Sequence, residues 1–183
     1  MKKTMFAAAF VLGFGAIAHA ADGKYQVGLG LYDSIPVSSD FKEYKSSLGF
    51  NVYGDYKIND TFAAGVELGD TFGYAYKADT SIKEKELICG VRGKIGKSMD
   101  FGSKKGNVYG IVGIASHRFS SSGYKTITKV DYNFGAGAQM EIAPQWLVGL
   151  EARYHALKAT DQDTGKSLNI NGIVPTLTFG YSF

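Results

Sequence analysis

Two histidines and their neighbouring serines are the residues of this chain best suited to catalysis. Beyond the N-terminal segment, His117 and His155 are the only histidines, and imidazole is the usual general base for a serine nucleophile. Ser116 and Ser120 lie near His117. In an extended strand, a spacing of three places two side chains on opposite faces, so His117 and Ser120 make a poor pair. We therefore interpret His117 as structural or at the edge of a loop, and we predict no catalytic residue.

Cofactor and metal motifs are also missing from the sequence. Cys89 is the only cysteine, and the possible metal ligands do not cluster along the chain. Gly96-Lys97-Ser98 and Gly165-Lys166-Ser167 resemble the end of a phosphate-binding loop, but Val91 and Thr160 stand where that motif needs its first glycine. The sequence predicts no bound cofactor and no metal.

Charged residues recur at every second position in several segments, which places them on one face of a strand. If that face lines a dry interior, the charges must pair, because an isolated buried charge is costly. Symmetric hairpins would bring Glu67 opposite Arg92 and Asp131 opposite His155. We predict an internal network of Glu67, Arg92, Asp131, Glu151, Arg153 and His155. The full set of inward charges expected from parity is Asp55, Lys57, Glu67, Glu86, Arg92, Lys94, Asp131, Glu141, Glu151, Arg153 and His155.

Eight strands are expected to position these charges. In one of them Trp146, Val148 and Leu150 alternate with Glu151 and Arg153, so one face is apolar and the other polar. The faces of a second strand cannot be assigned, because residues 108–114 are nearly all apolar or glycine. The predicted strands cover residues 24–33, 47–58, 61–76, 84–96, 107–119, 127–142, 145–158 and 171–183.

The connections between these strands alternate between short and long. Residues 59–60 and 143–145 form short turns, whereas longer polar loops cover 34–46, 77–83, 120–126 and 159–170. Short periplasmic turns and long outer loops are typical of outer-membrane barrels. The segment 97–106 does not fit, because it falls on the turn side and is long. The sequence thus predicts an all-β, eight-stranded, antiparallel up-and-down transmembrane β-barrel.

Aromatic residues near the strand ends fit two membrane interfaces, where a ring buries its body and hydrates its tip. The last strand alternates in the same way and ends on an aromatic residue. Its apolar positions, Leu177, Phe179, Tyr181 and Phe183, are predicted to form the C-terminal assembly signal. The two aromatic girdles are predicted to contain Tyr25, Tyr56, Phe62, Phe72, Tyr74, Tyr132, Trp146 and Tyr154.

The N-terminal segment has the features of a cleaved secretory signal peptide. Lys2 and Lys3 precede an uncharged run, and Ala18-His19-Ala20 supplies the small residues of a cleavage site. We predict a signal peptide at 1–20 and a barrel domain at 21–183. Without Lys2 and Lys3 the chain has 18 basic and 17 acidic residues, a net charge of +1, which argues against a nucleic-acid partner.

Several stretches resemble the small eight-stranded outer-membrane barrels of the OmpX/Ail and opacity-protein type. They are residues 107–114, residues 132–140 and the C-terminal Gly180-Tyr181-Ser182-Phe183, with Tyr56-Lys57-Ile58-Asn59-Asp60 similar to the first periplasmic turn. The resemblance implies an integral protein of the cell outer membrane, in contact with its lipid and lipopolysaccharide. It also implies that the barrel-assembly machinery reads the strand ending at Phe183.

Function is predicted to be non-enzymatic: envelope support, or surface interaction such as adhesion or serum resistance, through four extracellular loops. Host or environmental surface ligands are then the expected partners. One alternative is a lipid A-modifying enzyme around His117 or His155, although the His-x-Ser spacing of the lipid A deacylases is absent. A narrow gated pore is a second alternative. A soluble periplasmic β-barrel with an apolar interior is the third.

Overall fold

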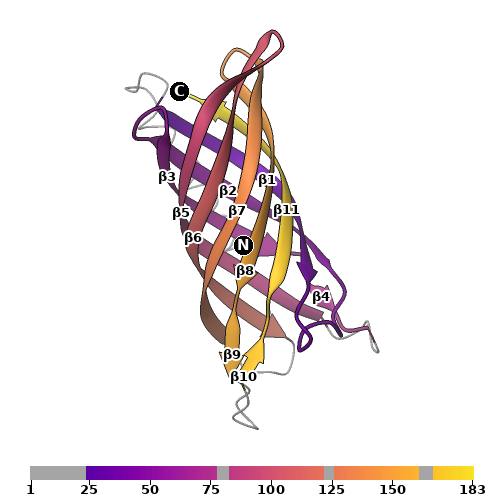
Figure 1. Cartoon of the computed structure of the whole chain (residues 1–183). Helices are drawn as coiled ribbons and strands as arrows, with labels where there is room; N and C mark the ends of the chain where they lie inside the picture. The colour runs from indigo at the N-terminus through magenta and orange to yellow at the C-terminus, as the bar shows by residue number, and fades with distance from the viewer. Residues whose placement is uncertain (1–23, 78–82, 122–125, 161–166) are drawn as a thin grey trace, which may run out of the picture.

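The computed structural model describes residues 24–77, 83–121, 126–160 and 167–183, and every regular element in these ranges is a β-strand. The signal peptide predicted at 1–20 lies outside the described residues. Among the described residues, no helix is long and apolar enough to span a membrane. The strands, shown in Figure 1, are β1 (Tyr25–Pro36), β2 (Ser47–Lys57), β3 (Phe62–Thr71), β4 (Tyr74–Ala75), β5 (Lys83–Phe101), β6 (Lys104–Ser121), β7 (Ile127–Ala143), β8 (Trp146–Ala156), β9 (Lys158–Thr160), β10 (Ser167–Asn169) and β11 (Gly172–Ser182).

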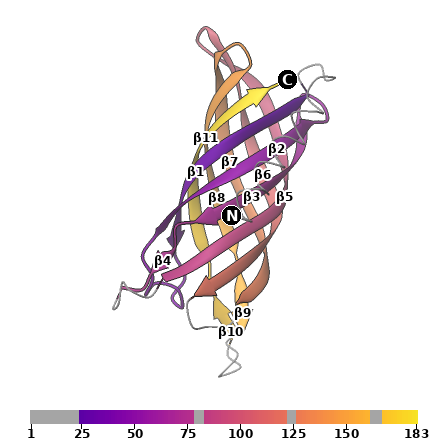
Figure 2. The same cartoon turned by 180° about the vertical axis from the view of Figure 1, so that it is seen from behind.

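The strands form one closed antiparallel barrel. The sheet runs β3-β2-β1-β11-β8-β7-β6-β5-β4, and an added pairing of β3 with β5 closes it. The first and last strands meet along a seam from Gln26–Ser182 to Pro36–Gly172. β4 follows β3 after a bend, and β9 pairs with β10 in a separate ladder. The predicted eight-stranded barrel is confirmed, and Figures 1 and 2 show its tilted strands from opposite sides.

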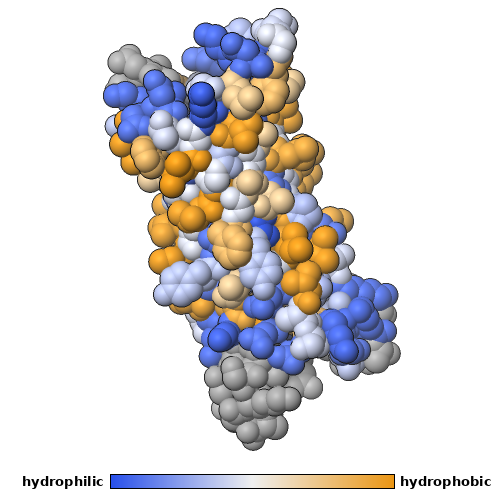
Figure 3. Space-filling view, viewed as in Figure 1, coloured by the Kyte–Doolittle hydropathy of each residue, from blue (hydrophilic) through white to orange (hydrophobic). Residues whose placement is uncertain are grey.

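Apolar side chains cover the outside of the barrel, and polar side chains fill its inside. On β8, 42% of Trp146 is exposed, whereas only 3% of Glu151 is. Figure 3 shows hydrophobic residues around the middle of the molecule and hydrophilic ones gathered at both ends. A soluble barrel has the reverse arrangement, because water favours polar side chains outside. The alternative of a soluble barrel with an apolar interior is therefore wrong.

Tight turns connect the strands at one end of the barrel, which we call the turn end. The Asn59 side chain accepts hydrogen bonds from the backbone N–H groups of Thr61 and Phe62, both at 2.9 Å. The segment 97–106 is not a long loop. β5 and β6 continue into it as a paired hairpin, and only Gly102 and Ser103 separate them. Gly102 has a φ of 65°, a left-handed conformation that glycine adopts without strain.

A bend after β3 turns one of the predicted girdle residues into the barrel. Gly73 has a φ of 109°, which interrupts the alternation of side chains between the two faces. Phe72 remains 63% exposed on the outside, but Tyr74 turns into the barrel and is 2% exposed. The Tyr74 hydroxyl donates a hydrogen bond to Glu86 Oε2 at 2.6 Å. The prediction that Tyr74 belongs to the outer girdle is therefore wrong.

Several of the other aromatic residues predicted for the girdles make ring contacts with one another. At the turn end, Trp146 packs against Phe179 and Tyr181, with ring centroids 5.1 and 4.9 Å away. Tyr181 in turn contacts Phe183 at 4.8 Å. Two further contacts join Tyr25 to Tyr56 at the turn end and Phe134 to Tyr154 between β7 and β8. On the outer face, exposure is 40% for Tyr56, 46% for Phe62, 68% for Tyr132, 50% for Leu177 and 45% for Phe179.

The structure assigns the two faces of β6 that the sequence left open. Ile111, Ala115 and His117 are at most 3% exposed and point inward, whereas 56% of Val112 is exposed on the outside. Both faces carry apolar residues, so alternation in hydropathy could not distinguish them. Phe119 continues the inward row to the end of the strand.

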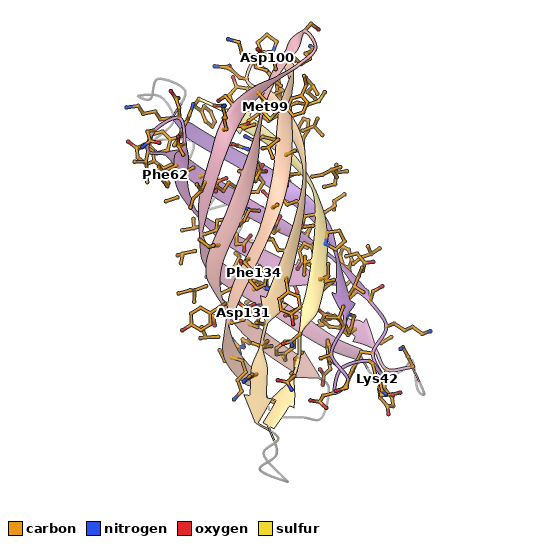
Figure 4. All side chains as sticks on the ribbon, viewed as in Figure 1. Lys42, Phe62, Met99, Asp100, Asp131 and Phe134 are labelled. Atoms are coloured by element: carbon orange, nitrogen blue, oxygen red, sulfur yellow. The ribbon has the colours of Figure 1, made fainter. Side chains whose placement is uncertain are left out.

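A charge placed on the outer face should be most costly near the middle of the strands. We expect Val112→Arg to lower the free energy of unfolding in lipid vesicles by about 2–4 kcal/mol, because the guanidinium enters the hydrocarbon. Met99→Arg is the matched control. Met99 is 48% exposed and lies in the β5–β6 hairpin near the turn end (Figure 4), so the expected loss there is at most about 1 kcal/mol. Equal losses in urea titrations of the two variants would contradict the assigned outer face.

Candidate functional site

A network of six charged side chains occupies the middle of the barrel. We call it the central charge network, and it consists of Asp55, Glu67, Arg92, Lys94, Glu151 and Arg153. Arg92 is its hub: Nε and Nη2 each lie 2.9 Å from a different oxygen of Asp55. Nη1 lies 3.4 Å from Glu151 Oε2 and 3.7 Å from Glu67 Oε2. This paired geometry suits guanidinium, whose planar fork matches a carboxylate.

Lys94 and Arg153 complete the network. Lys94 Nζ lies 3.0 Å from Asp55 Oδ2 and 2.9 Å from Glu151 Oε1, and 4.4 Å from the centre of the Tyr109 ring. Arg153 Nη1 lies 2.5 Å from Glu67 Oε1. The network contains three acids and three bases, so its charges balance. Balance matters because an uncompensated buried charge is strongly destabilising.

A second group, the outer histidine cluster, lies between this network and the loop end of the barrel. It consists of Glu86, His117, Asp131 and His155. His117 Nδ1 lies 2.5 Å from Glu86 Oε1, and His155 Nδ1 lies 2.6 Å from Asp131 Oδ2. Asp131 is fully buried and also accepts a hydrogen bond from the backbone N–H of Ala115. Figure 4 places Asp131 on β7, in the half of the barrel nearer β9 and β10.

Above this cluster, four apolar side chains close the loop end of the barrel. This outer cap consists of Phe41, Tyr74, Phe119 and Leu157, none more than 8% exposed. The loop carrying Phe41 is held down by hydrogen bonds: Asn169 N–H donates to Asp40 Oδ2 at 2.9 Å. The cap therefore separates the interior from the surroundings at this end.

The turn end, by contrast, opens into a vestibule. A cavity of about 840 Å³ is lined by Lys24, Lys57 and Glu141 among others. Its inner wall includes Asp55 and Lys94, which belong to the central charge network. Access from this end therefore stops at the ion pairs.

The structure brings both predicted pairs into contact, but in a different register. Arg92 stands opposite Gly65 rather than Glu67, and His155 stands opposite Asn133 rather than Asp131. Each register is shifted by two residues, which keeps these four side chains on their predicted faces. The bend at Gly73 lies within the first hairpin, where the register of β4 with β5 differs by one residue from that of β3 with β5.

The sequence analysis missed His117 and, with it, a cluster of possible metal ligands. His117, Asp131 and His155 come from three neighbouring strands, and one ligand atom of each lies within 4.8 Å of the others. The inference that the chain lacks clustered ligands was therefore wrong. Tyr109 and His117 are an even number of positions apart and share a face, but the sequence did not show which face of β6 is inside.

The family model for the outer membrane protein beta-barrel domain matches residues 5–183. The chain belongs to this family. It is thus an integral protein of the outer membrane. Comparison with curated protein sequences finds no match.

Solved structures of similar fold are small outer-membrane proteins. Neisserial surface protein A is 14% identical with a TM-score of 0.63, and the alignment covers 87% of this chain and 97% of that one. Ail of Yersinia pestis, crystallised with the heparin analogue sucrose octasulfate, is 18% identical with a TM-score of 0.58, covering 89% and 100%. The N-terminal barrel of OprF from Pseudomonas aeruginosa is 11% identical with a TM-score of 0.55, covering 88% and 100%.

Removing the hub of the central charge network should cost much more than removing a surface pair. We expect Arg92→Met to lower the free energy of unfolding by about 3–5 kcal/mol, since Asp55 and Glu151 lose a buried partner. The control is Lys57→Met, which breaks the ion pair of Lys57 with Asp60, 44% and 93% exposed. There the loss should be below about 1 kcal/mol. Urea unfolding in vesicles measures both, and a similar small loss in Arg92→Met would refute the role of the network.

Proposed function

We propose that this protein is a non-enzymatic, closed outer-membrane barrel that acts at the cell surface through its outer loops. The filled and capped interior is the observation that carries the proposal. An eight-stranded barrel is just wide enough for its own side chains. Here ion pairs occupy the middle and the outer cap covers the loop end. This arrangement does not support a constitutive pore, because the cavity at the turn end stops at the ion pairs.

The positions of the histidines support the alternative of a lipid A-modifying enzyme less well than they support a non-enzymatic barrel. His117 and His155 are 3% and 6% exposed, and both point into the barrel. Ser120 is exposed on the opposite face of β6, where lipid would be reached. General base and nucleophile must lie within hydrogen-bond reach. The same geometry disfavours a catalytic pair of His117 and Ser120.

One edge of the loop end gathers exposed lysines. The loop at 37–46 pairs with the end of β4 and the residues after it: the Lys45 N–H donates to the Ala75 carbonyl at 2.9 Å, and the Lys77 N–H to the Glu43 carbonyl at 2.8 Å. The Lys77 ammonium donates to the Lys42 carbonyl. We call Lys42, Lys45 and Lys77 the basic edge. These bonds fix the backbone of the edge, and a fixed surface loop is a common recognition element.

The chemistry of the basic edge fits ligands that carry sulfate or phosphate esters. A lysine ammonium binds such groups as a point charge. Ail was crystallised with a heparin analogue. Because the two chains are only 18% identical, that complex supplies a molecule with which to test binding and does not indicate a shared binding site. Lipopolysaccharide also carries phosphate esters and is the second candidate ligand. Lys85 and Arg118 are exposed on the outer face of β5 and β6, near the loop end, where its phosphates would lie.

We also propose that the barrel-assembly machinery recognises the last strand. The support is the family resemblance and the position of β11, which pairs with β1 to close the sheet. Leu177 and Phe179 face outward along this strand, and Tyr181 and Phe183 follow at the turn end.

Reversing charge on the basic edge should weaken binding to heparin. In nanodiscs without lipopolysaccharide, we expect Lys42→Glu with Lys45→Glu to reduce affinity for immobilised heparin at least about tenfold, a change of 1.4 kcal/mol. Raising the salt concentration should weaken binding by the wild type, because exposed charges are screened. Adding lipopolysaccharide to the nanodiscs then tests whether it competes for the same lysines.

The matched control is Lys97→Glu with Lys105→Glu, which makes the same charge change at the turn end, where both lysines are exposed. This control should bind heparin as the wild type does. Equal binding by both double variants, or equal loss in both, would contradict a ligand site at the basic edge.

A further inference from the structure

The outer histidine cluster differs from the central charge network in its charge balance. The central charge network pairs three acids with three bases. The outer histidine cluster has two carboxylates, Glu86 and Asp131, and only two imidazoles. With neutral imidazoles the cluster itself carries two negative charges, and the half-buried Lys129, opposite His117 on β7, can offset only one of them. One divalent cation supplies the missing charge, and imidazole with carboxylate is a common ligand set for such ions.

The contacts of His117 orient one of its nitrogens as a ligand. Nδ1 lies 2.5 Å from Glu86 Oε1, and in the tautomer with the proton on Nδ1 the Nε2 lone pair is directed toward Asp131. Nε2 lies 3.2 Å from Asp131 Oδ1 but makes no hydrogen bond with it. An unprotonated Nε2 faces a lone pair of Asp131, and a proton or a metal ion between the two atoms removes that repulsion. For bonds of the length zinc makes, neighbouring tetrahedral ligands are about 3.3 Å apart, which is close to this separation.

His155 provides the third ligand. Its Nε2 is also buried and has no hydrogen-bond partner among the described residues. The two imidazole rings are 5.4 Å apart and nearly perpendicular, at 83°. Candidate ligand atoms of the three residues lie within 4.8 Å of one another, so a bound ion would draw them slightly together.

A small cavity adjoins two of the three proposed ligands, His117 and His155, but not Asp131. It has a volume of about 20 Å³ and is lined by Glu86, His117 and His155, together with the Tyr74 side chain from the outer cap. That space is enough for one water molecule. Three protein ligands leave the fourth tetrahedral position of zinc free for such a water.

We propose that His117, Asp131 and His155 form a binding site for a zinc-type divalent metal ion inside the barrel. Glu86 acts as a positioning residue, because a carboxylate on the second nitrogen of a ligand histidine fixes the ring and its tautomer. The ion would join β6, β7 and β8 directly beneath the outer cap.

The test uses the full chain, folded in the outer membrane, extracted in detergent and carrying no polyhistidine tag. After treatment with a chelator and addition of zinc, we expect one zinc ion per chain by elemental analysis, and a higher temperature of unfolding. His155→Gln should lose stoichiometric binding, and Glu86→Gln should keep it with affinity reduced about 10–100-fold. The control Glu141→Gln, which removes a carboxylate at the turn-end vestibule, should bind zinc as the wild type does.

A second measurement applies if the histidine variant does not fold. Cobalt(II) added to the wild type should give the visible absorption bands of a four-coordinate site, and equimolar zinc should abolish them. Absence of zinc from the wild type, absence of these bands, or full retention of zinc by a folded His155→Gln protein would each overturn the proposal.

Discussion

Backbone hydrogen bonding in the hydrocarbon layer is the constraint on which the structure depends. A membrane offers no water to an unpaired N–H or C=O group, so a spanning sheet must have no free edge. The pairing of β1 with β11 meets that requirement, and it extends over the length of both strands. Once the sheet is closed, the alternation of side chains gives every residue an inside or an outside position. The lipid-facing surface and the polar interior both follow from this one closure.

The number of strands then determines what the interior can hold. Eight strands leave room for side chains but not for an open channel. The polar face is filled by large charged groups around Arg92, each with a partner of opposite sign. Such pairs do not make a barrel more stable than an apolar filling would, because their desolvation is expensive. Because each buried charge is paired, removing one of them leaves its partner unpaired and destabilises the whole network.

Alternation in the sequence was enough to predict the barrel, its strand count and the face of most residues. Trp146 and Glu151 were assigned correctly because bulky apolar and charged residues separate cleanly on β8. The errors arose where a backbone feature breaks the pattern. Gly73 turned Tyr74 inward, and Gly102 converted an expected long connection into a hairpin.

Of the outer histidine cluster, only the contact of Asp131 with His155 was predicted from the sequence. Its members come from β5, β6, β7 and β8, and their meeting depends on strand registers that hydropathy does not encode. His117 was hidden because β6 carries apolar residues on both faces. Likewise, the outer cap combines a loop residue, Phe41, with residues at the ends of strands, and loop packing has no periodic signal.

Recording single-channel currents in planar lipid bilayers tests most directly whether the interior is closed. The protein should be inserted at low density, with a large-pore outer-membrane protein as the positive control for insertion. A barrel filled by the central charge network and covered by the outer cap should give no discrete openings across a wide range of voltage. Reproducible unitary openings from the wild type would contradict this account, and they would return the search for function to the interior.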